Sequence, residues 1–399
     1  MAAVTQVKGQ RRVGMTGDEA VAYAVKQADV DVIAAYPITP QTIIVERLAE
    51  YVNNGELNAA FIPVESEHSA LSTCVGASLA GARVFTATAS QGLALMYEIL
   101  WIASSMRTTI VMALANRALS APINIHCSHD DAYAARDTGW IQFFAENVQE
   151  AYDLTIQAFR VAEDKRVLLP TIINLDGFIL SHSLEGLYVL SDDEVRKFLP
   201  PKEPVNPIDV EKPMTYGPLA LYDYYYEFKR AQAEAMKTSY PVILEVFKEY
   251  EKVSGRKYAP VKAYGMEDAE VAMVILGSSA GTARYVARRM RERGEKVGVL
   301  SLTLYRPFPE KEIVKYLKNV KAAVIMDRSY SFGSPGAQLF MDIAAALYNE
   351  GERPLLINAI YGLGGRDLTP EQVEAAFRAA FEAAKTGVVK EREIWLGVR

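Results

Sequence analysis

Two carboxylates lie where the chain passes from a strand-like segment into a helix. Glu65 and Glu67 follow residues 61–64 and precede the apolar helix predicted over residues 70–79. A carboxylate at the end of a strand and under apolar cover can hydrogen-bond a ring nitrogen of a bound ligand. Alternatively, a glutamate in the first turn of a helix only interacts with the helix dipole. Glu67 is the stronger candidate for chemistry, and one of the two glutamates is expected to serve only the helix.

A hydroxyl group follows a second strand, which is predicted over residues 30–35. Pro37 ends this strand because it lacks an N–H donor. Thr39, just before Pro40, suits the N-cap of a helix predicted over residues 43–53, with proline at its first position. Free N–H groups there would hold a carboxylate or a phosphate. A capping turn without a ligand is the alternative.

Two further strands also end in polar residues. Residues 86–93 (TATASQGL) end one strand in small and hydroxyl side chains, which would let a flat ligand approach the backbone. A plain helix cap at Ser90 explains the same pattern equally well. Arg117 follows the strand predicted over residues 110–114, where its guanidinium would bind a substrate carboxylate. The usual alternative for such an arginine is a structural ion pair.

The composition is that of a globular protein with two or three domains, given 399 residues, 50% hydrophobic and 23% charged. A net charge of −6 without a basic block argues against nucleic-acid binding. No apolar stretch could span a bilayer, and residues 1–12 lack a signal-peptide core, so we expect a cytoplasmic protein.

Two cysteines, Cys74 and Cys127, are too few to hold an iron–sulfur cluster. His126 and His129 flank Cys127, but no second ligand pair follows, so no metal is expected there.

Alternating strands and helices predict a doubly wound α/β fold. We divide the chain into a first α/β domain (1–193), a Pro/Tyr-rich helical connector (194–265) and a second α/β domain (266–399). In the first domain, strands are predicted over residues 30–35, 60–63, 83–88, 110–114 and 168–174, and helices over 68–80, 92–105 and 148–164. In the second, strands are predicted over 271–276, 297–303, 322–327 and 355–360, and helices over 283–293 and 371–385.

Three other segments admit two interpretations each. Tyrosines at residues 222–226, at the start of one or two predicted long helices, are expected at a subunit or domain contact. The turn at residues 277–281 could hold a phosphate, although a tight structural turn is the stronger expectation. The polar residues 129–131, with 136–140, could carry a loop over a site or hold a subunit interface.

Together these motifs resemble the α subunit of the 2-oxoacid:ferredoxin oxidoreductases, most closely the pyruvate:ferredoxin enzyme. The resemblance rests on YPITP (36–40), ESEHSA (65–70), TATASQGL (86–93), NRALS (116–120), RDTGW (136–140), NVQE (147–150), DGF (176–178), YRPFP (305–309), DRS (327–329), FG (332–333) and GLGGRD (362–367). It implies a pyrimidine-binding domain of the thiamin-diphosphate type, followed by a transketolase-C-like domain. The implied reaction decarboxylates pyruvate, gives acetyl-coenzyme A and reduces ferredoxin.

The resemblance also implies roles for individual residues. Glu67 matches the glutamate that hydrogen-bonds N1′ of the thiamin aminopyrimidine. Thr39 and Arg117 match the residues that hold the 2-oxoacid carboxylate. The matched motifs place five more residues at the cofactor: Pro37, Ile38, Thr88, Ser90 and Gln91.

The same resemblance assigns the rest of the enzyme to partner chains. The Gly-Asp-Gly motif and following asparagine that hold magnesium and diphosphate in this fold are absent from the sequence. A β subunit would supply them, together with a nearby [4Fe–4S] cluster, and γ and ferredoxin-like δ subunits would complete the enzyme. Three alternatives are open: a branched-chain or aromatic 2-oxoacid as substrate, a catalytically silent structural subunit, and a free-standing ligand-binding protein.

Overall fold

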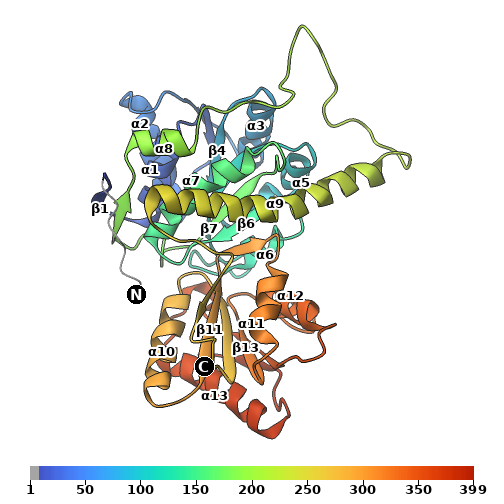
Figure 1. Ribbon diagram of the computed structural model, residues 1–399. Coiled ribbons are helices and arrows are strands. Elements are labelled where there is room, and N and C mark those ends of the chain that lie inside the picture. Colours follow the sequence, from blue (N-terminus) through green and yellow to red (C-terminus); the bar gives the residue numbers. More distant parts are fainter. Residues whose placement is uncertain (1–8) are drawn as a thin grey trace.

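The computed structural model describes residues 9–399. They form two α/β units, one above the other in Figure 1, and a long helix lies across the upper unit. Each sheet consists mainly of parallel strands and has apolar clusters on both faces. This architecture confirms the predicted doubly wound α/β class.

The first sheet has seven strands in the order β12-β6-β7-β5-β4-β2-β3. Its strands are β2 (Val32–Ala35), β3 (Ala60–Pro63), β4 (Val84–Thr88), β5 (Ile110–Asn116), β6 (Ile141–Phe144), β7 (Thr171–Asp176) and β12 (Leu304–Arg306). Neighbouring strands run parallel, except that β12 is antiparallel to β6. Because β2, β4 and β5 are adjacent and parallel, the turns that follow them meet at one edge of the sheet.

Helices cover both faces of this sheet. They are α1 (Gly17–Gln27), α2 (Thr42–Asn53), α3 (Glu67–Leu79), α4 (Ser90–Leu95), α5 (Tyr97–Ser105), α6 (Asp130–Ala134), α7 (Val148–Ala162) and α8 (Asp192–Phe198). Apolar side chains of α1, α2 and α7 form the core of one face, and those of α3, α5 and α6 contribute to the other. A separate antiparallel pair joins β1 (Arg11–Met15) to β8 (Glu185–Val189).

The second sheet has six strands in the order β15-β14-β13-β10-β11-β9. They are β9 (Val261–Tyr264), β10 (Val271–Leu276), β11 (Val297–Leu302), β13 (Ala322–Asp327), β14 (Leu355–Ile360) and β15 (Glu393–Trp395). Its helices are α10 (Ala280–Glu292), α11 (Glu310–Leu317), α12 (Gln338–Leu347) and α13 (Pro370–Thr386), with the 3₁₀ turn η1 (Leu363–Gly365). The four strands and two helices predicted for this part are confirmed, with end shifts of a few residues.

The long helix is α9 (Tyr225–Ser254). Its later turns bury Val242, Ile243 and Val246 in the core that also contains α7. The segment before it loops away from the body in Figure 1, and Tyr222 and Tyr226 are 90% and 79% exposed. Their expected role at a subunit contact stays a prediction, as does the division into domains at residues 193 and 265. No helix within residues 9–399 combines the length and apolar character needed to cross a membrane.

Some predicted elements are wrong in detail. The helix predicted over residues 92–105 is two helices, α4 and α5, which meet at Met96. The strand predicted over 168–174 begins at Thr171, because Leu168 has a positive φ of 45° and Pro170 cannot donate to a ladder. The sequence does not predict the strands β1, β6, β8, β9, β12 and β15. β6 follows the polar run, and β12 joins the first sheet although it lies in the range of the second domain.

The expected N-cap at Thr39 is also wrong. The helix α2 begins at Thr42, Gln41 occupies the N-cap position, and no side chain caps the helix. The Gln41 amide instead donates to the carbonyls of Tyr36 and Ala87, at 2.9 and 3.3 Å. These bonds tie the turn after β2 to the neighbouring strand β4, so the turn is held by a buried glutamine rather than by a threonine cap.

Candidate functional site

Glu67 is the first residue of α3 and lies buried, with 7% of its surface exposed. The helix begins here because the Ser66 hydroxyl accepts a hydrogen bond from the Ser69 N–H at 3.2 Å. Glu65 is exposed and accepts a 2.5 Å bond from the Ser69 hydroxyl, which lowers the pKa of Glu65. The structure therefore places Glu67 inside the protein and Glu65 at the surface, on the start of the same helix.

Gly92, in α4, permits a close approach between Glu67 and the end of β4. A Cβ atom at Gly92 would lie 2.4 Å from the Thr88 hydroxyl oxygen and 2.9 Å from a Glu67 carboxylate oxygen. Such distances are too short for any side chain, so only glycine fits here. The Thr88 hydroxyl is buried and has no hydrogen-bond partner among residues 9–399. A buried carboxylate and an unsatisfied hydroxyl thus both lie against the Gly92 backbone, and a polar group of a ligand could satisfy the hydroxyl.

Ser90 begins α4 in a strained conformation, with a φ of +47°. Its N–H donates to Asp131 Oδ2 at 3.0 Å, and its hydroxyl lies 2.6 Å from the Ala118 carbonyl and 2.5 Å from Gln91 Oε1. The alternative that Ser90 caps the helix is wrong, since Ala89 is the N-cap and makes no side-chain cap. Ser90 instead links the turn after β4 to the chain that follows β5.

Arg117 and Thr39 meet across the edge of the sheet. The Arg117 guanidinium donates to the Thr39 carbonyl at 2.9 Å and to the Asn124 carbonyl at 3.1 Å. Within residues 9–399, no carboxylate oxygen lies within 4.0 Å of this guanidinium, so the alternative of a structural ion pair is wrong. Arg117 is 7% exposed, and burial lowers its pKa, opposed by the charge of Asp131. A buried cation that contacts only carbonyl groups is suited to an anionic ligand.

Pro37, Ile38 and Thr39 form the turn after β2, at the same edge of the sheet. Pro37 and Thr39 are exposed, and Ile38 is half-buried. Gln91, on α4, is also half-buried. Pro37, Ile38, Thr39 and Gln91 are therefore accessible at this edge, whereas Glu67, Thr88, Ser90 and Arg117 are buried.

Two buried residues of this region were not singled out from the sequence. Gln41 holds the turn after β2, and nothing in its spacing indicated this role. Asp131 was noted only as part of a polar run, but its carboxylate accepts bonds from Ser90, Asn116 and Arg117. Burial raises the pKa of Asp131 to about 6, although its N–H donors oppose the rise.

The cysteine and histidine near this edge belong to a network between the two units. Ligand atoms of Cys127, His129 and Asp176 lie within 4.8 Å of one another, and all three residues are buried. Asp176 already accepts bonds from His129 at 2.8 Å, Arg328 at 3.0 Å and the Ser278 N–H at 3.1 Å. Burial alone would raise the pKa of Asp176, but His129 and Arg328 hold it below its usual range. A cation bound there would face the Arg328 guanidinium, so the arrangement does not favour a metal.

The same network accounts for the glycine turn at residues 277–281. A Cβ atom at Gly277, whose φ is +68°, would lie 2.7 Å from a carboxylate oxygen of Asp176. The Ser278 N–H and hydroxyl both donate to this carboxylate. The turn therefore holds an internal carboxylate from the first unit, and the phosphate alternative is wrong because that position is filled.

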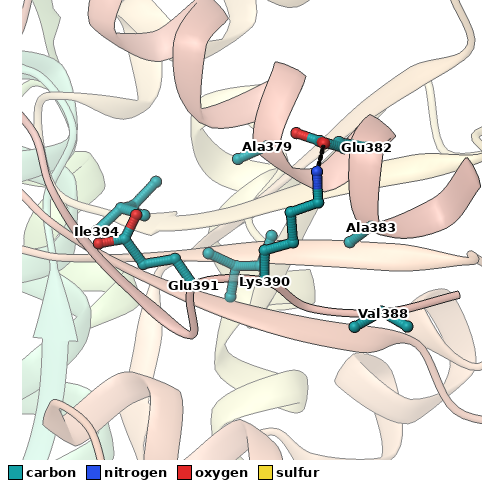
Figure 2. Close-up of a pocket in the computed structure, with 8 residues that line it drawn as sticks. Ala379, Glu382, Ala383, Val388, Lys390, Glu391 and Ile394 are labelled. Atoms are coloured by element: carbon teal, nitrogen blue, oxygen red, sulfur yellow. Dashed lines mark hydrogen bonds and ion pairs between the residues drawn. The ribbon is translucent and has the colours of Figure 1, made fainter. Parts of the chain in front are cut away.

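A cleft of about 210 Å³ lies on the second unit, apart from these residues. Figure 2 shows it between α13 and the end of the chain, where the Lys390 ammonium pairs with the Glu382 carboxylate. Its walls also include Ile357, Ala379, Ala383, Val388, Glu391 and Ile394. None of the candidate residues contributes to it, and its lysine is already neutralised.

Comparisons with known proteins agree with the motifs. Residues 23–248 match the family described as pyruvate flavodoxin/ferredoxin oxidoreductase, thiamine diphosphate-binding, and residues 269–373 match pyruvate:ferredoxin oxidoreductase core domain II. The chain is 51% identical over 389 residues to pyruvate synthase subunit PorA of Thermotoga maritima, covering 97% of this chain and 98% of that one. It is 50% identical over 386 residues to PorA of Pyrococcus furiosus, covering 96% and 97%.

A relative with another named substrate matches over a similar span. Ketoisovalerate oxidoreductase subunit VorA of Pyrococcus abyssi is 43% identical over 384 residues, covering 96% of each chain.

Solved structures show the same fold at low identity. A 2-oxoglutarate:ferredoxin oxidoreductase from Magnetococcus marinus gives a TM-score of 0.69 at 19% identity, covering 92% of this chain and 65% of that one. A split-gene transketolase gives 0.56 at 14% identity, covering 93% and 99%. The matches along the sequence, together with the gathered motifs, identify the family: this chain belongs to the pyruvate flavodoxin/ferredoxin oxidoreductases.

Proposed function

We propose that this chain is the α subunit of a multi-subunit enzyme that oxidises pyruvate with coenzyme A. Per turnover, pyruvate and coenzyme A give acetyl-coenzyme A, CO₂ and one proton, and two electrons pass to ferredoxin. Full-length similarity to PorA subunits supports this role. The observation that carries this proposal is the buried Arg117 guanidinium, which has no carboxylate partner within residues 9–399. It donates a hydrogen bond to the Thr39 carbonyl at the edge of the sheet, and Glu67 lies near the same edge.

The residues present fit the pyrimidine end of thiamin diphosphate. Glu67 is buried, the Thr88 hydroxyl has no partner within residues 9–399, and Gly92 lets these two side chains lie close together. Pro37 and Ile38 belong to the turn after β2, and Ser90 and Gln91 begin α4 at the same edge. We therefore assign this chain the pyrimidine-side half of the cofactor site.

Glu67 would hydrogen-bond N1′ of the aminopyrimidine ring and hold a proton there. Thiamin diphosphate, when bound, supplies the carbanion chemistry that removes the carboxyl carbon of a 2-oxoacid as CO₂. Arg117 would bind the carboxylate of the oxoacid, and the Thr39 hydroxyl would donate a hydrogen bond to it. Burial of Arg117 and Glu67 strengthens both interactions because little water competes for them.

Partner chains would complete the site. The sequence holds no Gly-Asp-Gly motif for magnesium and diphosphate, and two buried cysteines cannot hold a [4Fe–4S] cluster. We propose that a β subunit binds the magnesium, the diphosphate and a cluster, and that γ and ferredoxin-like δ subunits complete an enzyme that reduces ferredoxin. We also propose that the assembled enzyme is cytoplasmic.

A panel of 2-oxoacids tests the proposed substrate. The chain would be co-expressed anaerobically with its partner subunits, and the complex assayed for coenzyme A-dependent reduction of a viologen dye. Pyruvate is expected to give the highest kcat/KM. Preference for 3-methyl-2-oxobutanoate would favour the alternative suggested by the VorA match, and an intact, cofactor-loaded complex without activity on any oxoacid would overturn the enzymatic role.

A further inference from the structure

One buried carboxylate connects the oxoacid side of the proposed site to the thiamin side. Asp131 lies in α6, and none of its surface is exposed. Its Oδ2 atom accepts from the backbone N–H groups of both Ser90 and Arg117, each at 3.0 Å. Its Oδ1 atom accepts from the Asn116 side chain at 3.0 Å and from the Ala132 N–H at 2.8 Å. Every donor is an N–H group, which only an ionised carboxylate can satisfy on both oxygens.

Those donors belong to the ends of two adjacent strands. Ser90 follows β4, Asn116 is the last residue of β5, and Arg117 follows β5 directly. β4 and β5 are paired with each other only up to Thr88 and Leu114. β5 stays paired with β7 through Asn116, but no ladder bond joins the segment around Ser90 to the segment around Arg117. The Asp131 carboxylate links these two segments beyond the ladder, because its Oδ2 atom accepts a hydrogen bond from each of them.

The two backbone positions carry side chains that the proposed site uses. Ser90 has a φ of +47°, a conformation that costs free energy unless its surroundings hold it. Arg117 reaches from the other position to the Thr39 carbonyl. A shift at either backbone position would move the arginine relative to the thiamin side of the site.

We propose that Asp131 is a positioning residue that sets the place of the oxoacid-binding Arg117 through the backbones of Ser90 and Arg117. The proposal rests on the proposed function, because it assumes that Arg117 binds the oxoacid carboxylate. Asp131 itself contacts neither substrate nor cofactor. Its effect is therefore on substrate capture.

The variant Asp131→Asn tests this role in the assembled complex. The asparagine amide has one oxygen, which can accept either from the Ser90 and Arg117 N–H groups or from the Asn116 side chain and the Ala132 N–H. The NH₂ group would face the other pair of donors, so at least one strand end would lose its bond. We expect the KM for pyruvate to rise about tenfold or more, with a smaller change in kcat, because a displacement of about 1 Å is costly to substrate binding. The double variant with Arg117→Lys is expected to have the KM of Arg117→Lys alone, since Asp131 acts through Arg117.

A matched control is Asp327→Asn. Asp327 is equally buried and accepts bonds from the Leu339 N–H, the Phe340 N–H and the Asn358 side chain, but it lies in the second sheet. It also accepts a 3.4 Å bond from the Tyr133 hydroxyl of α6. Asp327→Asn is the same carboxylate-to-amide replacement but leaves the bonds from Ser90 and Arg117 to Asp131 in place, so the KM is expected to stay at the wild-type value. A rise in KM of equal size in both variants would mean a general effect of lost packing, and it would overturn the proposal.

The remaining outcomes separate the two claims. If Arg117→Lys raises the KM and Asp131→Asn does not, the positioning role is wrong while the proposed site stands. If Arg117→Lys leaves the KM unchanged, the proposed oxoacid site is wrong and the positioning role falls with it. Should Asp131→Asn fail to assemble, Asn116→Ser removes one donor to the same carboxylate; a KM rise of about threefold is then expected, and an unchanged KM overturns the proposal.

Discussion

The Arg117 guanidinium donates a 2.9 Å hydrogen bond to the Thr39 carbonyl, which joins two residues 78 positions apart in the chain. This bond brings the turn after β2 against the end of β5. It fixes the direction of a buried cation that has no carboxylate partner within residues 9–399. The proposed oxoacid site depends on this guanidinium, because it gives the site its positive charge.

Arg117→Ala should weaken pyruvate capture. Removing a charged partner of a desolvated carboxylate costs about 2–5 kcal/mol, so a large rise in the KM for pyruvate is expected. Arg107→Ala is the control, because Arg107 also donates to carbonyls, those of Val167 and Leu168, but precedes β5. Steady-state kinetics of the complex would measure both, and an unchanged KM in Arg117→Ala would contradict the assignment.

Glu67→Gln should reduce turnover while leaving the complex assembled. Loss of a group that holds a proton typically costs on the order of 10²-fold in rate, and we expect at least that in kcat. Glu65→Gln is matched in chemistry and lies at the exposed start of the same helix, so its kcat should stay near the wild-type value. The reverse result would move the role to Glu65.

Gly92→Ala should disturb the thiamin side of the site. The added methyl group would lie 2.4 Å from the Thr88 hydroxyl oxygen and 2.9 Å from a Glu67 oxygen. We expect kcat/KM for pyruvate to fall about tenfold or more, because the glutamate must move. Gly76→Ala, on the exposed side of α3 with nothing within 4 Å, should leave activity unchanged and stabilise the chain by about 0.5–1 kcal/mol. Equal activity in both variants would show that Glu67 does not need its present position.

Acid should weaken the contact between the two units. Burial alone would raise the pKa of the Glu146 carboxyl. The charges of Lys262 and Arg284 instead hold this pKa at about 2, below its ordinary value of 4.5. The same lysine also pairs with Glu150. Because the folded-state pKa of Glu146 is depressed, this stabilisation is present above about pH 4.5 and is lost as pH falls toward 2.

The variant Glu146→Gln tests that sign. Melting temperatures of the full chain, measured from pH 7 to pH 2, should decline less between pH 4.5 and 2 in the variant than in the wild type. The control is Glu382→Gln, whose exposed pair with Lys390 should contribute little. Parallel curves for wild type and Glu146→Gln would contradict a stabilising role for this ion pair.

Local patterns predicted most of what lies within one strand or helix. The strand β3 has the predicted bounds, and β2, β4 and β5 are close, because apolar runs and turn residues depend on neighbours in sequence. The placement of polar groups at the carboxyl ends of β4 and β5 also followed from the parallel order.

Contacts between distant residues could not be predicted in this way. The bond from Ser278 to Asp176 spans 102 positions and turns an expected ligand loop into an internal contact. The role of Asp131 could not be predicted for the same reason. The sequence shows the polar residues beside it, but not that its carboxylate contacts the ends of two strands. β12 joins the first sheet only because the second unit packs beside it.

The central claim is that this chain holds half of a thiamin diphosphate site. Binding of thiamin diphosphate, in the presence of Mg²⁺, would be measured by isothermal titration calorimetry. The samples would be the purified chain, its partner subunit and their complex. Saturable binding is expected for the complex, and no binding is expected for this chain alone at the same concentrations. Binding by the isolated chain as tight as by the complex would contradict the claim.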